Sequence, residues 1–296
     1  MTVGEKGEDE LIAALCQGLA GSDKVVVGPG DDCAVVGPGE ELTLLKTDAV
    51  VEGVHFLPDE NPERVGWKAV ARVLSDFAAM GGRPGELLVT LAVPGRTRVE
   101  RVEGLYEGMS ACLGRHGGVI VGGETTSLPE GAPMMISVAG RGLVDREQLV
   151  TRSGGKPGEG IFVTGRLGGS LAGRHLDFDP RLREAAWLVE RFRPSAMMDL
   201  SDGLAKDLPR LAGMSGCGFQ LDREAIPCHE RCSVDQALGD GEDYELLFSS
   251  RAGLELLNAW REEFPDLELT KIGEFVPDDG DRLTGGWDHF RRPEEG

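Results

Sequence analysis

The chain of 296 residues carries 51 acidic and 31 basic side chains, which gives a formal net charge of -20. This charge repels nucleic acid and anionic membrane surfaces and excludes both as partners unless metal ions mediate the contact. No run approaches the roughly 18 apolar residues that span a bilayer, and the acidic N-terminus has no apolar signal core, so we expect a cytoplasmic location.

Strands and helices are both predicted along the first half of the chain. Apolar runs at 42–45 and 119–121 end in polar or glycine residues, which is typical of buried strands. The clearest helix is predicted from Pro62 to Met80, where apolar residues recur at i, i+3/4 and i+7 and two glycines follow. Further strands at 87–93 and 134–139 complete an α+β first half.

A glycine-rich segment at 152–158 has the composition of a linker, and a new strand is predicted directly after it, at 161–164. We therefore expect two domains, formed by residues 1–145 and 146–296.

The second domain is predicted to be α/β. Its expected elements are a strand at 196–198, a helix that begins near Leu204, a strand at 244–248 and a helix at 253–263.

The six cysteines lack the spacing of a disulfide framework, and we expect reduced thiols. Cys228-His229-x-x-Cys232 has no second Cys/His pair at finger-like spacing, so we interpret it as a loop rather than a zinc site.

Carboxylates follow predicted strands or interrupt a predicted core face in five places. Magnesium prefers such hard oxygen ligands, completed by water and phosphate. The five places are Gly30-Asp31-Asp32, Thr47-Asp48, Ser75-Asp76, Gly123-Glu124 and Asp199-Leu200-Ser201-Asp202-Gly203.

Asp76 is the most informative of these residues, because it lies on a helix face that is otherwise apolar. A buried, unpaired carboxylate is costly, so Asp76 is predicted to bind metal, to cap a neighbouring helix or to pair with Arg72. Asp199 to Asp202 has a simpler alternative, since Ser or Asp before a helix is often only an N-cap.

The usual nucleotide-binding signatures are missing from the sequence. There is no G-x-x-x-x-G-K-[ST] loop, no G-x-G-x-x-G after a strand and no H-R-D catalytic loop. The residues alone therefore indicate a multi-carboxylate metal site in an α+β protein, compatible with a kinase, a synthetase or a metallo-hydrolase.

Six motifs in this order and spacing resemble the thiamine-monophosphate kinase family, in the PurM-like superfamily of aminoimidazole ribonucleotide synthetase. The resemblance covers nearly the whole chain. The motifs are Gly30 to Ala34, Thr47-Asp48 with Glu52 to Phe56, Ser75 to Gly81, Gly122 to Thr126, Asp199 to Leu204 and Gly241 to Leu246.

The resemblance implies a two-domain PurM-like fold in which the N-terminal domains of a homodimer form a β-barrel. It also implies an ATP-dependent kinase that converts thiamine monophosphate to thiamine diphosphate with several Mg²⁺ ions. The implied metal ligands are Asp32, Thr47, Asp48, Asp76, Glu124, Asp199 and Asp202. The implied ATP contacts are Tyr106, Gly122, Gly123, Arg152 and Ser201.

His55, Glu242 and Trp287 match positions that face thiamine monophosphate in the family. An aromatic ring beside a thiazolium cation is physically reasonable, although Trp287 and Tyr106 are equally compatible with ordinary packing. The attacking oxygen belongs to a phosphate that is already ionised, so we assign no residue as a general base and expect positioning and metal neutralisation to dominate.

Two positions depart from the family pattern, because Lys46 stands where a hydroxyl residue is usual and Glu124 where Asp is usual. Lys46 is expected to replace the charge of one cation, to offer only its backbone carbonyl or to point away. These departures leave open the alternative that the chain is a non-catalytic or regulatory relative that binds nucleotide or a thiamine phosphate. Another PurM-like enzyme, such as a selenophosphate synthetase or a hydrogenase-maturation protein, is disfavoured because the reactive terminal Cys is not found.

Overall fold

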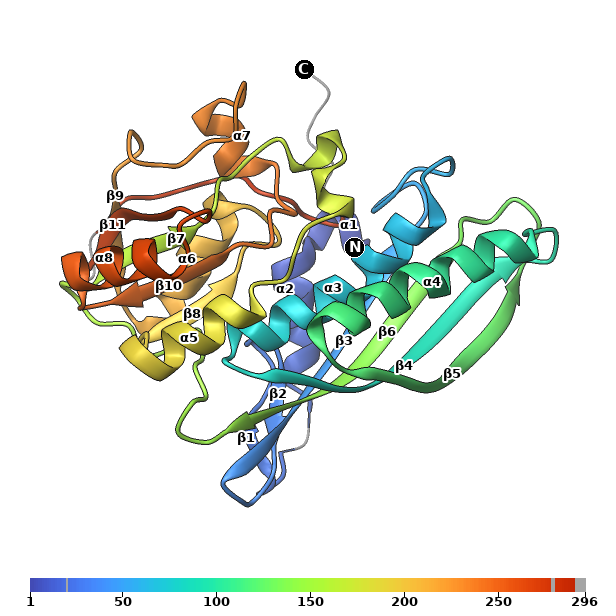
Figure 1. Ribbon diagram of the computed structural model, residues 1–296, viewed down its shortest axis with the longest axis horizontal. Helices are drawn as coiled ribbons and strands as arrows, with labels where there is room; N and C mark the ends of the chain where they lie inside the picture. Colours follow the sequence, from blue (N-terminus) through green and yellow to red (C-terminus); the bar gives the residue numbers. More distant parts are fainter. Residues whose placement is uncertain (20, 278–279, 291–296) are drawn as a thin grey trace.

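The computed structural model describes residues 1–19, 21–277 and 280–290, and it contains two β-sheets with helices packed against them (Figure 1). Two helices, α1 (Val3–Lys6) and α2 (Glu8–Cys16), precede the first sheet. Within the described ranges, no helix has the length and apolarity needed to cross a membrane.

The first sheet has six strands and is open, so that β1 and β5 form its edges. Its spatial order is β1 (Val25–Val27), β2 (Ala34–Val36), β3 (Glu41–Val51), β6 (Met135–Asp145), β4 (Arg83–Pro94) and β5 (Val119–Leu128). All pairs are antiparallel except β4 with β5, and α4 (Val99–His116) supplies the crossover that a parallel pair requires. The predicted barrel is therefore not closed within one chain.

Helices α3 (Pro62–Ala79) and α4 cover one face of this sheet (Figure 1). Asn61 caps α3 by accepting a hydrogen bond from the Glu63 N–H, and the two helices approach closely through glycines. A Cβ atom on Gly66 would lie 1.9 Å from the Leu105 carbonyl oxygen, so only glycine permits this packing. The helix predicted at 62–80 is confirmed.

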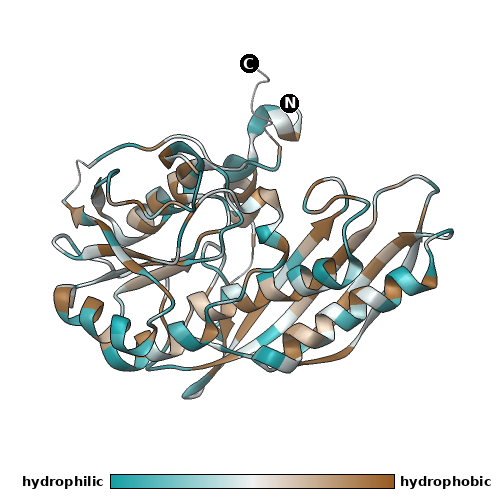
Figure 2. Cartoon of the chain, turned by 45° about the horizontal axis from the view of Figure 1, so that its top comes forward, coloured by the Kyte–Doolittle hydropathy of each residue, from teal (hydrophilic) through white to brown (hydrophobic). Residues whose placement is uncertain are grey.

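The second sheet has five strands, all paired antiparallel. Its order is β8 (Ala196–Asp199), β10 (Leu246–Ser250), β7 (Gly160–Thr164), β11 (Leu269–Val276) and β9 (Gly218–Leu221). One core lies toward α5 (Leu182–Phe192) and α8 (Gly253–Glu263), and the other toward α6 (Leu204–Ser215) and α7 (Val234–Gly239). Strands β8, β10 and β7 are buried on both faces, which explains their mostly apolar composition. The helices instead alternate hydrophobic and hydrophilic residues (Figure 2).

Helix α3 also joins the two halves, because it contacts β8 and α5 as well as the first sheet. Two short 3₁₀ helices, η1 (Ser170–Ala172) and η2 (Arg174–Leu176), follow β7, and η2 packs against α3. The end of β8 is thereby brought to the polar face of α3.

Candidate functional site

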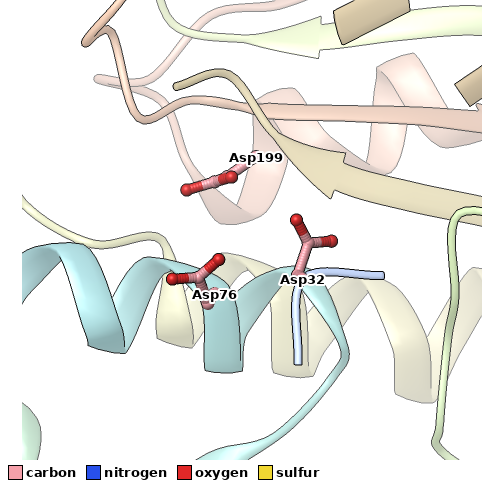
Figure 3. Close-up of side chains that lie close together, drawn as sticks. All are labelled: Asp32, Asp76 and Asp199. Carbon is pink, nitrogen blue, oxygen red and sulfur yellow. The ribbon is translucent and has the colours of Figure 1, made fainter. Parts of the chain in front are cut away.

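Three buried aspartates from separate elements meet where the two halves of the chain join (Figure 3). Asp32 lies just before β2, Asp76 on α3 and Asp199 at the end of β8. One carboxylate oxygen from each lies within 4.8 Å of the others, and the residues are only 2%, 5% and 3% exposed. We call this group the aspartate cluster.

The aspartate cluster fits a divalent cation. Burial and the neighbouring Asp32 raise the pKa of Asp199 to about 6, and burial also raises the pKa of Asp76 well above its usual range. Asp32 Oδ2 is buried without a hydrogen-bond partner within the described structure. Crowded carboxylates with an unpaired oxygen are the hard ligands that Mg²⁺ prefers.

Lys46 reaches into the aspartate cluster and so does not point away from it, which was one of the three expectations. Its Nζ lies 2.7 Å from Asp76 Oδ1 and 4.0 Å from Asp48 Oδ1. The alternative pairing of Asp76 with Arg72 is wrong: Arg72 donates to the Ala49 carbonyl at 3.0 Å, and its Nη2 lies 3.9 Å from Asp48 Oδ1.

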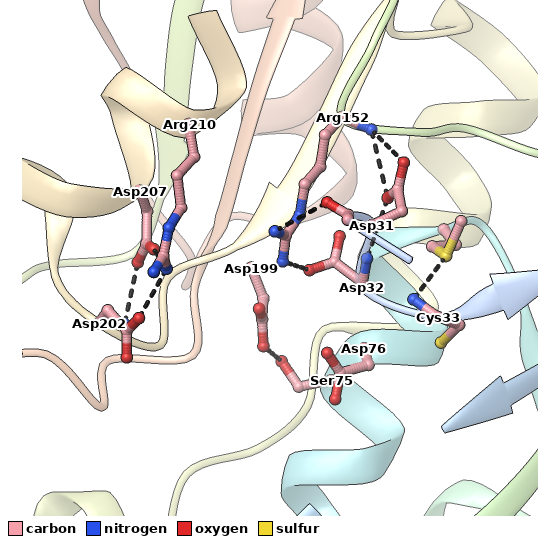
Figure 4. Close-up of polar contacts among 12 residues, drawn as sticks. Asp31, Asp32, Cys33, Ser75, Asp76, Arg152, Asp199, Asp202, Asp207 and Arg210 are labelled. Carbon is pink, nitrogen blue, oxygen red and sulfur yellow. Dashed lines mark hydrogen bonds and ion pairs between the residues drawn. The ribbon is translucent and has the colours of Figure 1, made fainter. Parts of the chain in front are cut away.

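Asp202 lies beside α6 and carries its own counter-ions rather than joining the three aspartates (Figure 4). Its Oδ2 is 2.6 Å from Arg210 Nη1 and 3.2 Å from Lys206 Nζ. Burial opposes ionisation, but the two cations lower the pKa of Asp202. Asp207 accepts the backbone N–H of Asp202, and burial together with Asp202 raises the pKa of Asp207 to about 8.

Two predicted metal ligands lie apart from the aspartate cluster. The Thr47 side chain is on the opposite face of β3 from Lys46 and Asp48, as strand alternation requires, and its Oγ1 is 3.5 Å from Ser137 Oγ. Glu124 is exposed on the edge strand β5, which β4 and β6 separate from β3.

The predicted ATP contacts are also divided between two places. Arg152 is bonded to Asp32 through its guanidinium and to Asp31 through its backbone N–H (Figure 4). Ser201 follows β8 closely, whereas Tyr106 is on α4. Gly122 and Gly123 lie on β5, where a Cβ atom on Gly123 would be 1.9 Å from the Val89 carbonyl oxygen.

His55, Glu242 and Trp287 line one cavity of about 150 Å³, so the structure brings all three predicted substrate residues together. Ser201, Asp202 and Arg72 line it as well. This cavity, called here the substrate cavity, lies next to the aspartate cluster, because its lining residues Ser201 and Asp202 are two and three positions after Asp199 in the chain.

His55 carries a hydrogen-bond donor without a described partner in the wall of this cavity. Burial lowers the pKa of His55 to about 4, so the ring is neutral at pH 7. Its Nδ1 accepts the Val51 N–H at 3.0 Å, which leaves the proton on Nε2. His55 Nε2 is buried and has no partner in the described structure.

Lys68 was not predicted, and it holds two walls of the substrate cavity. Its fully buried Nζ lies 2.7 Å from the His55 carbonyl oxygen, 2.7 Å from His175 Nδ1 and 2.8 Å from Glu242 Oε2. Burial opposes ionisation of Glu242, but His175 and Lys68 lower the pKa of Glu242 to about 2. A lysine on the apolar face of the 62–80 helix is the signal that could have revealed it.

Known proteins resemble the chain over almost its whole length. The family model "AIR synthase related protein, N-terminal domain" matches residues 30–144, and its C-terminal counterpart matches residues 140–286. A thiamine-monophosphate kinase from Rhodopirellula baltica is 37% identical, over 82% of this chain and 78% of that protein. Another, from Salmonella typhimurium, is 34% identical over 97% of this chain and 99% of that protein.

A solved structure, AaThiL complexed with AMPPCP and TMP, has the same fold. Its TM-score is 0.84 at 31% identity, and the match covers 98% of this chain and 99% of that one.

Proposed function

The chain belongs to the thiamine-monophosphate kinase family, and from this premise we propose that it transfers the γ-phosphoryl group of ATP to the phosphate of thiamine monophosphate. The products are thiamine diphosphate and ADP. The observation that carries the proposal is the position of the aspartate cluster beside a cavity lined by His55, Glu242 and Trp287.

Asp32, Asp76 and Asp199 are proposed to hold Mg²⁺, which neutralises phosphate oxygens when it is bound. Asp48, which Lys46 links to Asp76, is proposed to join this set. Thr47, Glu124 and Asp202 lie apart from the aspartate cluster and are proposed to hold further Mg²⁺ ions. Tyr106, Gly122, Gly123, Arg152 and Ser201 are proposed to contact ATP. No general base is assigned, because the attacking phosphate oxygen is already ionised and the residues only have to position it.

The substrate cavity is proposed to bind the thiamine part of the acceptor. Trp287 is 37% exposed and offers an aromatic face to a thiazolium cation. His55 Nε2 offers a donor, and the Glu242 carboxylate, held ionised by Lys68, offers an acceptor. Together these groups favour a ligand with a ring cation and polar substituents.

We further propose a cytoplasmic homodimer whose first sheets join into a barrel, with domains 1–145 and 146–296. The outer face of the first sheet supports dimerisation, since Leu45, Leu88 and Val121 are 44%, 50% and 58% exposed around a hollow of about 450 Å³. A second copy would cover this face and the β5 edge. Analytical ultracentrifugation tests the proposal, and a monomer at micromolar concentration contradicts it.

The decisive assay measures thiamine diphosphate and ADP formed from thiamine monophosphate and ATP, with and without Mg²⁺ and with free thiamine as a control. Magnesium-dependent, stoichiometric product from the monophosphate alone is expected. Saturable binding of both ligands without turnover would instead identify a binding relative whose chemistry is altered at Lys46 and Glu124.

A further inference from the structure

Arg72 is a cation that borders the substrate cavity. It lies on α3 one turn before Asp76, so that both side chains are on the same face of the helix. Its side chain is 12% exposed. Nη1 donates to the Ala49 carbonyl, Nη2 lies 3.9 Å from Asp48 Oδ1, and Nε is buried without a partner in the described structure.

Among the described residues, most of the hydrogen-bonding capacity of Arg72 is therefore unused, since a guanidinium carries five N–H donors. The other described cations at this place are already engaged. Lys68 has three partners, Lys206 and Arg210 both hold Asp202, and Arg152 holds Asp32.

The position of Arg72 also matches the place where an acceptor phosphate has to lie. The acceptor must extend from the substrate cavity toward the aspartate cluster, because the incoming phosphoryl group is neutralised there. Arg72 lines the cavity and neighbours Asp48, which Lys46 links to Asp76 of the cluster. A planar guanidinium can bind two oxygens of one phosphate at once.

We propose that the Arg72 guanidinium binds the phosphate already present on thiamine monophosphate and fixes it between the substrate cavity and the aspartate cluster. The proposal rests on the proposed function and makes Arg72 the residue that distinguishes the monophosphate from free thiamine.

Isothermal titration of the full chain with thiamine monophosphate and with thiamine, in Mg²⁺ and without nucleotide, tests the assignment. In the wild type, the monophosphate binds more tightly. In Arg72→Met, its affinity falls by about 10- to 100-fold, the loss expected for charge-assisted hydrogen bonds, while thiamine binding is nearly unchanged. Arg72→Lys keeps the charge and recovers part of the difference.

Arg64→Met is the matched control, because Arg64 lies on the same helix but pairs with Asp177 at the surface. It leaves both affinities unchanged. An unchanged ratio of the two affinities in Arg72→Met overturns the role of Arg72 alone. A wild type that does not prefer the monophosphate overturns the proposed function as well.

The contact itself can be observed in the wild type, and a variant is needed only to assign one resonance. In a ¹H–¹⁵N spectrum of protein labelled with ¹⁵N-arginine, the Arg72 Nε–H resonance is assigned by its loss in Arg72→Lys. Thiamine monophosphate is expected to shift this resonance, and thiamine is not. A resonance that ignores the monophosphate at saturation refutes the contact.

Discussion

Two groups of buried charges, each with one member on α3, are balanced in opposite ways. The aspartate cluster has three carboxylates, a raised pKa at Asp76 and at Asp199, and an unpartnered oxygen on Asp32. In the group formed by Lys68, Glu242 and His175, called here the lysine network, the ammonium and the carboxylate satisfy each other.

The difference separates a group of charges that is expected to bind a cation from a group that stabilises the fold. Buried charges without sufficient counter-charge destabilise the fold unless a cation arrives from outside, whereas a closed network stabilises the walls of the cavity beside it. The aspartate cluster is therefore expected to govern activity, and the lysine network to govern stability and shape.

Asp76→Asn is expected to have the largest effect. It removes one proposed metal ligand and should lower kcat by about 10³-fold or more, since metal neutralisation contributes several kcal/mol to such reactions. Stability in the absence of Mg²⁺ should be unchanged or higher, because a crowded carboxylate disappears. Steady-state kinetics and thermal unfolding measure the two effects, and a variant that keeps wild-type activity would show that Asp76 is not required.

Lys68→Met should do the opposite and act mainly on stability. It leaves the Glu242 carboxylate buried without its cation, which costs about 3 to 5 kcal/mol of the free energy of unfolding. Urea unfolding measures the loss. Adding Glu242→Gln to the same chain should recover much of it, and a double variant no more stable than Lys68→Met would contradict the pairing.

The pH dependence of stability sharpens the same contrast. Glu242 has a folded-state pKa of about 2 against 4.5 ordinarily, so its contribution is present above pH 4.5 and is lost as the pH falls toward 2. The full loss is about 3 kcal/mol. Unfolding in urea at several pH values should show this loss in the wild type and not in Glu242→Gln. Equal pH profiles for the two proteins would rule out the lowered pKa.

The sequence predicted much of this fold, because the decisive signals were local. The helix at 62–80 follows from apolar periodicity and the two glycines after it, and the structure contains it as well as the helix expected at 253–263. The strand expected at 244–248 begins two residues later, at Leu246. Glu242 and Tyr244 adopt φ values of 53° and 52°, which lie outside the strand region. The residue types at these two positions do not predict positive φ values.

The site was predictable where burial and charge conflict within one element. Asp76 was identified in this way. Lys68 is likewise a charged residue on the apolar face of the 62–80 helix, but it was not predicted. The placement of Thr47 on the outer face also follows from strand alternation, since Lys46 and Asp48 share the other face. The separation of Glu124 from the aspartate cluster could not be predicted from the local sequence, because it depends on the order of strands in the sheet.

Lys46 makes the aspartate cluster partly similar to the lysine network, because it places a mostly buried ammonium beside one of the three carboxylates. Its ammonium, 2.7 Å from Asp76 Oδ1, competes with any metal ion for that oxygen. Lys46→Ser should therefore strengthen Mg²⁺ binding to the nucleotide-free protein by roughly tenfold, equivalent to about 1.4 kcal/mol of charge interaction. Isothermal titration with Mg²⁺ measures the change, and Lys24→Ser is the control at a surface lysine. If Lys46→Ser instead weakens Mg²⁺ binding, the ammonium organises the ligands rather than competing for them, and the cluster as it stands is already shaped for its metal.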